Sequence, residues 1–297
     1  MDNLAPKEIA DEEMINQAFH ELLNDYLNTK HRKKVEIITK AFNFANQAHK
    51  GIKRRSGEPY IMHPIAVASI VCNEIGLGST SICAALLHDV VEDTDYTVED
   101  IENIFGPKIA QIVDGLTKIS GGIFGDRASA QAENFKKLLL TMSNDIRVIL
   151  IKIADRLHNM RTLGSMLPNK QYKIAGETLY IYAPLANRLG LYKIKTELEN
   201  LSFKYEHPEE YAEIEEKLNA TAAERDKVFN DFTAPIRTQL DKMGLKYRIL
   251  ARVKSIYSIW NKMQTKHVPL RSLSSHQMIS HRTYFLQVHC IHLYVDC

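Results

Sequence analysis

Few cysteines and no strong charge of one sign limit what this protein can be. The sequence has four cysteines in 297 residues, and none form a Cys-x-x-Cys pair. Cys72 and Cys83 fall within apolar helical patterns, so we expect small core residues in a reducing, cytoplasmic setting. The 38 basic and 36 acidic residues leave a formal net charge of +2. Direct DNA binding is not expected from a balance so close to neutral.

Long hydrophobic runs and internal repeats are also missing. No apolar run is long enough to cross a bilayer, so no membrane partner is expected. The N-terminal segment is acidic and lacks the apolar core of a signal peptide. Nothing in the sequence supports association with the ribosome. The composition, 45% hydrophobic and 25% charged, is that of an ordinary globular protein with one large domain or two modest ones.

Apolar residues recur with helical spacing along most of the chain, which predicts a mainly α fold. A capping box is expected where Thr97 is followed by Asp100, and Gly106-Pro107 marks a turn and a new helix start. The helices are expected at about 36–50, 64–75, 79–92, 130–142, 145–163, 169–188, 191–204 and 208–243.

The pattern changes near Gly244. Residues 246–250 are expected to form a strand and residues 256–263 a short helix. The prediction is therefore a helical bundle followed by a short, incomplete α/β segment. That segment has too few residues for a secure core of its own.

The strongest chemical signal is the run His88-Asp89-Val90-Val91-Glu92-Asp93. A carboxylate on an apolar helix is costly to bury without a partner, and a divalent cation is a natural partner for an adjacent His and Asp. Imidazole and carboxylate together suit Mn²⁺, Fe²⁺ or Zn²⁺. Glu92 and Asp93 each lie one helical turn beyond a candidate ligand. The alternative is a helix end that runs into a solvated acidic turn.

Two further residues are candidates to complete such a site. His63 precedes Pro64 where a helix begins, and alone it is better explained as a capping or core histidine. Asp155 follows the apolar run 148–153, and an internal pair with Arg156 or Arg161 explains it equally well. Asn159 and Thr162 lie further along the same helical face and are candidates to line a ligand pocket.

Five segments resemble the RelA/SpoT family of ppGpp synthetase/hydrolases, within the HD superfamily of metal phosphohydrolases with ligand order H…HD…D. The resemblance extends over about residues 20–269. The segments are Gly57–Pro64, His88–Thr97, Val113–Lys118, Asp145–Leu163 and Tyr182–Gly190.

The resemblance implies a role for each matching residue. The implied metal ligands, normally for Mn²⁺, are His63, His88, Asp89 and Asp155. The implied catalytic acidic pair is Glu92 and Asp93. The implied nucleotide-binding residues are Arg54, which packs on guanine, and its pocket neighbours Arg55, Ser56, Asn159 and Thr162.

The activity implied is Mn²⁺-dependent hydrolysis of the 3′-pyrophosphate of ppGpp or pppGpp, giving GDP or GTP and pyrophosphate. One alternative is an HD phosphohydrolase for another nucleotide. A second is a catalytically silent, guanine-nucleotide-binding regulatory module, which the intact pair Glu92 and Asp93 disfavours. A third is a chain that does not fold stably, because a broken second domain exposes Ile256, Ile259 and Trp260.

Residues 252–263 resemble the opening motif of the family's synthetase domain. By that resemblance Arg252, Lys254, Ser258 and Lys262 contact ATP phosphates, although Ala251 and Val253 replace the usual Gly and Pro. The resemblance stops after about Pro269. Asp296 is the only carboxylate beyond it, so no GTP pyrophosphokinase activity is expected. The histidines and cysteines of this tail are better explained as accidental composition than as a zinc site.

The predicted organisation has four parts. They are an HD-type metal phosphohydrolase domain over residues 1–200, a helical connector over 201–244, the start of a truncated transferase domain over 245–269, and an aberrant tail over 270–297.

Overall fold

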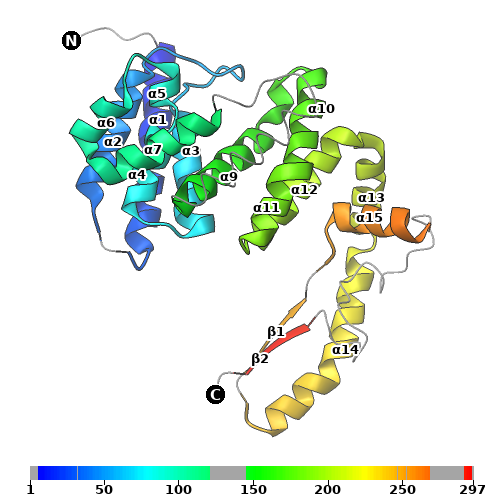
Figure 1. Ribbon diagram of the computed structural model, residues 1–297. Coiled ribbons are helices and arrows are strands. Elements are labelled where there is room, and N and C mark those ends of the chain that lie inside the picture. Colours follow the sequence, from blue (N-terminus) through cyan, green and yellow to red (C-terminus); the bar gives the residue numbers. More distant parts are fainter. Residues whose placement is uncertain are drawn as a thin grey trace. The chain divides into compact units, whose positions relative to one another are not determined.

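The computed structural model describes residues 6–31, 33–120, 145–245, 247–251, 253–267 and 291–295 (Figure 1). The chain divides into two compact units, Met1–Leu198 and Glu199–Cys297. The helix predicted at 130–142 lies outside the described residues, as do Arg252 and Asp296. The division falls close to the predicted end of the first domain, while the identities assigned to the later segments stay predictions.

The first unit is mainly helical in its described parts, as predicted. Its α-helices are α1 (Pro6–Asn28), α2 (Val35–Ala48), α3 (Met62–Ile70), α4 (Ser79–Leu87), α5 (Val90–Asp93), α6 (Val98–Phe105), α7 (Pro107–Ser120), α9 (Ile146–Arg161), α10 (Pro168–Glu177), α11 (Ala183–Arg188) and the first half of α12 (Tyr192–Glu206). Its other helical turns are η1 (Val71–Ile75) and η3 (Thr178–Tyr182), which are π-helical, and η2 (Leu163–Ser165), which is 3-10.

Helix α4 forms the centre of this unit. All residues from Ser81 to Leu87 are buried, and the helix contacts α2, α3, α7 and α9. A helix that is apolar all round must be buried all round, and this one ends directly before His88 and Asp89. Helices α1 and α2 pack through Phe19 and Phe42, whose rings stack with centroids 3.8 Å apart.

The predicted helix boundaries at residues 97–107 are confirmed. Thr97 Oγ1 accepts from the Asp100 amide at 3.2 Å, and Asp100 Oδ2 accepts from the Thr97 amide at 2.8 Å. Both bonds of a capping box therefore start α6. Helix α6 ends at Phe105, the next residue Gly106 has a φ of +86°, and α7 starts at Pro107.

The continuous helix predicted over 79–92 is wrong. Helix α4 ends at Leu87 and α5 starts at Val90, so His88 and Asp89 form a turn between them. Adjacent residues of an uninterrupted helix do not face the same way. Across this break, His88 Nε2 and Asp89 Oδ2 lie 3.1 Å apart.

The helix predicted over 169–188 also has an interruption. The π turn η3 lies between α10 and α11 and ends two residues before Pro184. Proline has no amide hydrogen and clashes with the carbonyl four residues before it, so a regular α-helix cannot pass through this point.

The second unit contains the second half of α12, α13 (Pro208–Ala220), α14 (Ala222–Lys242), β1 (Tyr247–Ala251), α15 (Ile256–Lys266) and β2 (Ile291–Val295). The stretch 208–243 is thus two helices, with Thr221 between them. The two strands pair antiparallel, with Ile249 opposite Leu293. The strand at 291–295 was not predicted.

The third alternative, in which the second unit exposes apolar surface, is wrong for Ile256 and Ile259. Their exposed fractions are 8% and 1%, and they pack with Phe203, Ile214 and Leu218. Tyr211, Tyr257, Trp260 and Met263 pack against this cluster. Among the helices in the described ranges, none has the length and apolar character needed to cross a membrane.

Candidate metal and nucleotide site

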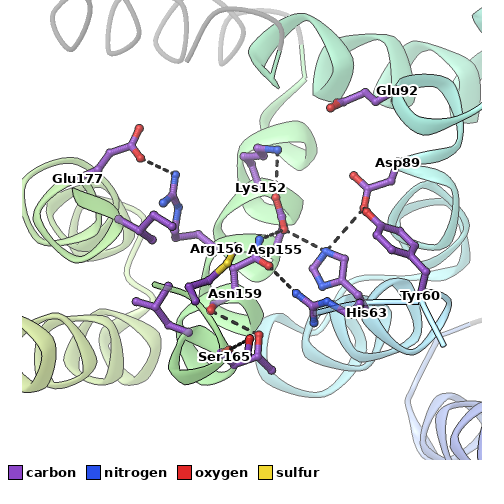
Figure 2. Close-up of a pocket in the computed structure, with 15 residues that line it drawn as sticks. Tyr60, His63, Asp89, Glu92, Lys152, Asp155, Arg156, Asn159, Ser165 and Glu177 are labelled. Carbon is purple, nitrogen blue, oxygen red and sulfur yellow. Dashed lines mark hydrogen bonds and ion pairs between the residues drawn. The ribbon is translucent and has the colours of Figure 1, made fainter. Parts of the chain in front are cut away.

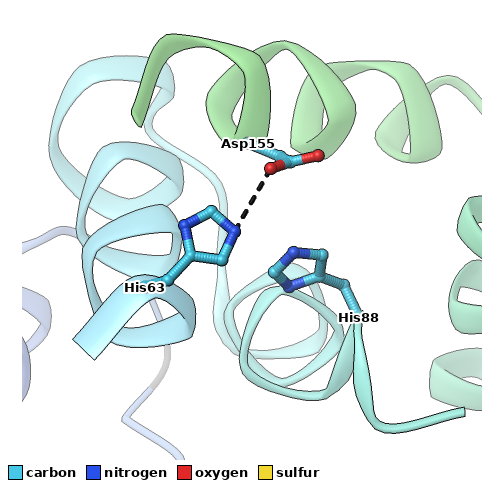
Figure 3. Close-up of side chains that lie close together, drawn as sticks. All are labelled: His63, His88 and Asp155. Carbon is cyan, nitrogen blue, oxygen red and sulfur yellow. Dashed lines mark ion pairs between the residues drawn. The ribbon is translucent and has the colours of Figure 1, made fainter. Parts of the chain in front are cut away.

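Side chains from three helical segments converge in the first unit. His63 comes from the first turn of α3, His88 and Asp89 from the break between α4 and α5, and Asp155 from α9. One ligand atom each of His63, His88 and Asp155 lie within 4.8 Å of one another (Figure 3). Asp89 Oδ2 lies 3.7 Å from His63 Nε2 and 3.1 Å from His88 Nε2. The structure thus brings together all four side chains that the sequence pointed to.

The ring of His88 is buried and oriented by its own helix. Its Nδ1 lies 2.7 Å from the Ala85 carbonyl, so Nδ1 carries the hydrogen and donates it. Its Nε2 is buried with no hydrogen-bond partner, since the nearby Asp89 oxygen is not aligned to accept. Burial lowers the pKa of His88, but Asp89 and Asp155 outweigh it and raise the pKa to about 9. The two carboxylates therefore favour positive charge beside this nitrogen.

Asp155 is held through both carboxylate oxygens. Oδ1 accepts from Asn159 Nδ2 at 2.6 Å and lies 3.2 Å from His63 Nε2, while Oδ2 pairs with Lys152 Nζ at 3.0 Å. Burial raises the pKa of Asp155, but the positive charge of Lys152 outweighs it and lowers the pKa well below its usual range. Asp155 is therefore an anion.

The predicted alternative for Asp155, an internal pair with a neighbouring arginine, is wrong. Arg156 pairs with Glu177 at 3.0 Å, and Arg161 pairs with Glu74 and Glu197. The cation that pairs with Asp155 is Lys152, one turn earlier on α9.

Tyr60 supports Asp89 from the other side of the cluster. Its hydroxyl donates to Asp89 Oδ2 at 2.7 Å, and its ring stacks on the buried His49 with centroids 4.7 Å apart. Burial and the nearby charge of Asp89 raise the pKa of Tyr60, so the phenol keeps its hydrogen and remains a donor.

The residues present fit a divalent cation. A buried nitrogen of His88 has no hydrogen-bond partner and lies in a group of ligand atoms only a few ångströms across. His63 Nε2 faces two carboxylates, an arrangement that gains stability from positive charge between them. Two imidazoles with two carboxylates are a donor set for Mn²⁺, Fe²⁺ or Zn²⁺.

A cavity of about 340 Å³ opens beside the cluster (Figure 2). His63, Asp89 and Asp155 form part of its wall. Four of the other predicted site residues also line it, namely Arg54, Glu92, Asn159 and Thr162.

A second cavity of about 470 Å³ shares Arg54, Tyr60, Ser165 and Met166 with the first. Its other lining residues include Lys53, Arg55 and Asp93. Glu92 and Asp93, adjacent in sequence, therefore line different cavities. Ser56 is exposed and is not among the described residues that line either cavity.

A tight loop presents Arg54. The Arg54 amide donates to the Glu58 carbonyl at 2.9 Å, and the Gly57 amide donates to the Arg54 carbonyl at 2.9 Å. Gly57 has a φ of +91°, a conformation that favours glycine, which explains its place in the Arg55-Ser56-Gly57 turn. The Arg54 guanidinium donates through Nη2 to Asn159 Oδ1 at 3.1 Å and through Nη1 to His158 Nδ1 at 3.4 Å.

Three residues that touch the cluster were not predicted, namely Tyr60, Lys152 and His158. Lys152 and His158 lie one turn before and after Asp155, which places them beside it on a helix. A single lysine inside the apolar run 148–153 was a usable signal, because a buried lysine needs an anionic partner. Tyr60 gave no comparable signal, since its role depends on a loop conformation.

The residues assigned by resemblance to ATP phosphates lie in the second unit. Ser255 Oγ accepts from the Ser258 amide at 3.2 Å and donates to Ser258 Oγ at 2.7 Å, which caps the start of α15. Lys254 precedes this cap and Lys262 lies on α15, while Arg252 is outside the described residues. Their contact with phosphates stays a prediction.

Comparison with known proteins identifies the family. The family model described as HD domain matches residues 41–192. A guanosine-3′,5′-bis(diphosphate) 3′-pyrophosphohydrolase of Vibrio cholerae is 48% identical over 232 residues, which are 78% of this chain and 33% of the relative. The bifunctional (p)ppGpp synthase/hydrolase SpoT of Escherichia coli is 44% identical over 257 residues, 86% of this chain and 36% of the relative. A GTP pyrophosphokinase of Myxococcus xanthus is 46% identical over 253 residues, 84% of this chain and 33% of the relative.

The chain belongs to the HD domain family, on its RelA/SpoT branch, which confirms the resemblance seen in the sequence motifs. It spans about a third of the length of these curated relatives. An HD domain implies a divalent metal, and the cluster of His63, His88 and Asp155 is a possible site for it.

Proposed function

We propose that this chain hydrolyses the 3′-pyrophosphate of ppGpp or pppGpp to GDP or GTP and pyrophosphate. The observation that carries the proposal is the convergence of His63, His88, Asp89 and Asp155 beside a cavity lined by Arg54. The substrate is supported by the names of relatives at 44% and 48% identity, which describe ppGpp hydrolysis. We further propose a cytoplasmic setting, which the free, buried thiols of Cys72 and Cys83 support.

The four converging side chains would hold Mn²⁺. When bound, such a cation supplies Lewis acidity, because it neutralises phosphate charge and lowers the pKa of water. Tyr60 and Lys152 keep Asp89 and Asp155 in place as anions. Glu92 lines the same cavity as the cluster and accepts the proton of the attacking water. Asp93 orients this water from the neighbouring cavity.

Arg54 and its neighbours would bind the nucleotide. The planar guanidinium of Arg54 stacks on the guanine base, and Asn159 on α9 and Thr162 directly after it contact the nucleoside. Lys53 and Arg55 give the second cavity its positive charge and meet the phosphates. These roles place the base, the phosphates and the proton acceptor around one cluster.

Product analysis tests the proposal. The pure chain is incubated with ppGpp and Mn²⁺, with and without a chelator, and the nucleotide and pyrophosphate products are separated. We expect GDP and pyrophosphate in equal amounts with Mn²⁺ and none with the chelator. A panel of other nucleotides tests the substrate in the same assay.

Two variants sharpen the test. Asp89→Ala removes a proposed ligand. We expect its rate of ppGpp hydrolysis to fall by more than the roughly 10- to 100-fold that is typical of residues outside the ligand shell. Asp114→Ala is the matched control, since Asp114 forms an exposed pair with Lys118. Cleavage by Asp89→Ala at the parental rate would falsify the metal assignment. Binding of ppGpp with no turnover under any metal condition would instead indicate the silent module.

A further inference from the structure

We infer that His158 is a positioning residue that fixes the ring of His63 so that one of its nitrogens is available to the metal. The inference rests on the proposed metal site and adds a residue to it. His63 Nδ1 and His158 Nδ1 lie 2.7 Å apart, and the two ring centroids are 4.8 Å apart. Two nitrogens at this distance share one hydrogen, so one ring donates and the other accepts.

Arg54 decides which ring accepts. Its Nη1 lies 3.4 Å from His158 Nδ1, and a guanidinium has five N–H donors and no acceptor. His158 Nδ1 therefore presents a lone pair. The hydrogen between the two rings then belongs to His63 Nδ1, which donates to His158.

The consequence appears at the opposite nitrogen of His63. A neutral ring that carries its hydrogen on Nδ1 has a lone pair on Nε2. His63 Nε2 is the atom that lies 3.2 Å from Asp155 Oδ1 and 3.7 Å from Asp89 Oδ2. The partner of one ring nitrogen thus selects the tautomer in which the other nitrogen can bind a cation.

His158 does not act on the substrate by contact. Among the described residues that line the two cavities, His158 is not found, although Arg54, His63 and Asn159 are. Asn159 forms a parallel support, because its Nδ2 donates to Asp155 while its Oδ1 accepts from Arg54. Arg54 therefore orients both supports, one for His63 and one for Asp155.

The test compares two substitutions at this position in the full chain. His158→Asn keeps an acceptor oxygen close to where Nδ1 was, whereas His158→Leu keeps bulk without an acceptor. We expect His158→Leu to weaken Mn²⁺ binding by about 10- to 100-fold, the range typical of residues that support a ligand. We expect His158→Asn to recover most of the affinity. The control is His20→Leu, since the exposed His20 bonds only to the Asn16 carbonyl of its own helix among the contacts described.

The readout is the Mn²⁺ dissociation constant from titration calorimetry without nucleotide, so it does not depend on hydrolysis. Equal Mn²⁺ affinity in the parental chain and His158→Leu overturns the role of His158 and leaves the proposed metal site intact. Failure of the parental chain to bind Mn²⁺ overturns both.

A second measurement covers the case in which His158→Leu does not fold. Nitrogen-15 NMR of the histidine rings in the Zn²⁺-bound parental chain reports the tautomer of His63 directly. We expect the hydrogen on Nδ1. A hydrogen on Nε2 of His63 would overturn the inference without any variant.

Discussion

Replacement of Lys152 by Met tests whether the cluster depends on buried charge. Lys152 Nζ lies 3.0 Å from Asp155 Oδ2, and the two side chains are only 12% and 10% exposed. Removing one partner of a buried pair leaves an uncompensated charge and destabilises a protein by about 3–5 kcal/mol. In Lys152→Met, Asp155 keeps its hydrogen bond from Asn159 and its contact with His63. The loss of stability should therefore lie near the lower end of this range. With chelator present, we therefore expect Lys152→Met to lower the free energy of unfolding of the first unit by about 3 kcal/mol.

The assay is urea unfolding followed by circular dichroism, in chelator and in Mn²⁺. The loss of unfolding free energy in Lys152→Met should be smaller in Mn²⁺ than in chelator. A bound cation stabilises the folded state and would also neutralise the charge of Asp155. The control is Lys118→Met, since Lys118 and Asp114 form an exposed i,i+4 pair that is worth no more than about 0.5 kcal/mol. An equal, small loss of unfolding free energy in both variants in chelator would show that the Lys152–Asp155 pair does not stabilise the fold.

Three further outcomes are expected. Because the pKa of His88 is raised from 6.5 to about 9, its stabilising contribution in chelator is complete below about pH 6.5 and is lost as the pH rises through 9. Mn²⁺ affinity should rise over the same pH interval, because the cation takes the place of the His88 proton. Calorimetry at several pH values checks this, and a dissociation constant that does not change with pH would contradict it. Tyr60→Phe removes the hydroxyl that donates to Asp89 and should weaken Mn²⁺ binding at least about 10-fold, and an unchanged dissociation constant would count against this role. Thr97→Ala removes the α6 cap and should lower the unfolding free energy by about 1 kcal/mol in urea titrations, with Mn²⁺ affinity unchanged.

The fold could be predicted where it depends on local sequence. Helical periodicity, the capping box at Thr97 and the Gly106-Pro107 start all depend on residues within one or two turns of each other. The break at His88 and Asp89 was missed because both residues have helical φ and ψ, so nothing local forbids a continuous helix. The burial of Ile256 and Ile259 was missed because their partners lie on α12 and α13, far back in the sequence.

The site, like the fold, could be predicted only where it depends on local sequence. The four candidate ligands could be found because a charged or imidazole side chain within an apolar run needs a partner. The residues that orient these ligands could not be found, because their hydrogen bonds join residues far apart in the sequence. Arg54 and His158 are separated by 104 positions, and His63 and His158 by 95. Hydrogen bonds between side chains so far apart in sequence depend on how α3, α9 and the loop before α3 pack together. The periodicity of apolar residues does not predict this packing.

The chemistry of Arg54 links the two halves of the site. Two of its nitrogens donate in different directions, one to His158 and one to Asn159, while the same side chain lines both cavities. A lysine has a single nitrogen on a flexible stem and lacks the planar fork that holds two acceptors at once. A nucleotide that reorients this guanidinium must therefore alter the supports of His63 and Asp155. By thermodynamic linkage, whatever factor the nucleotide imposes on metal affinity, the metal imposes on nucleotide affinity.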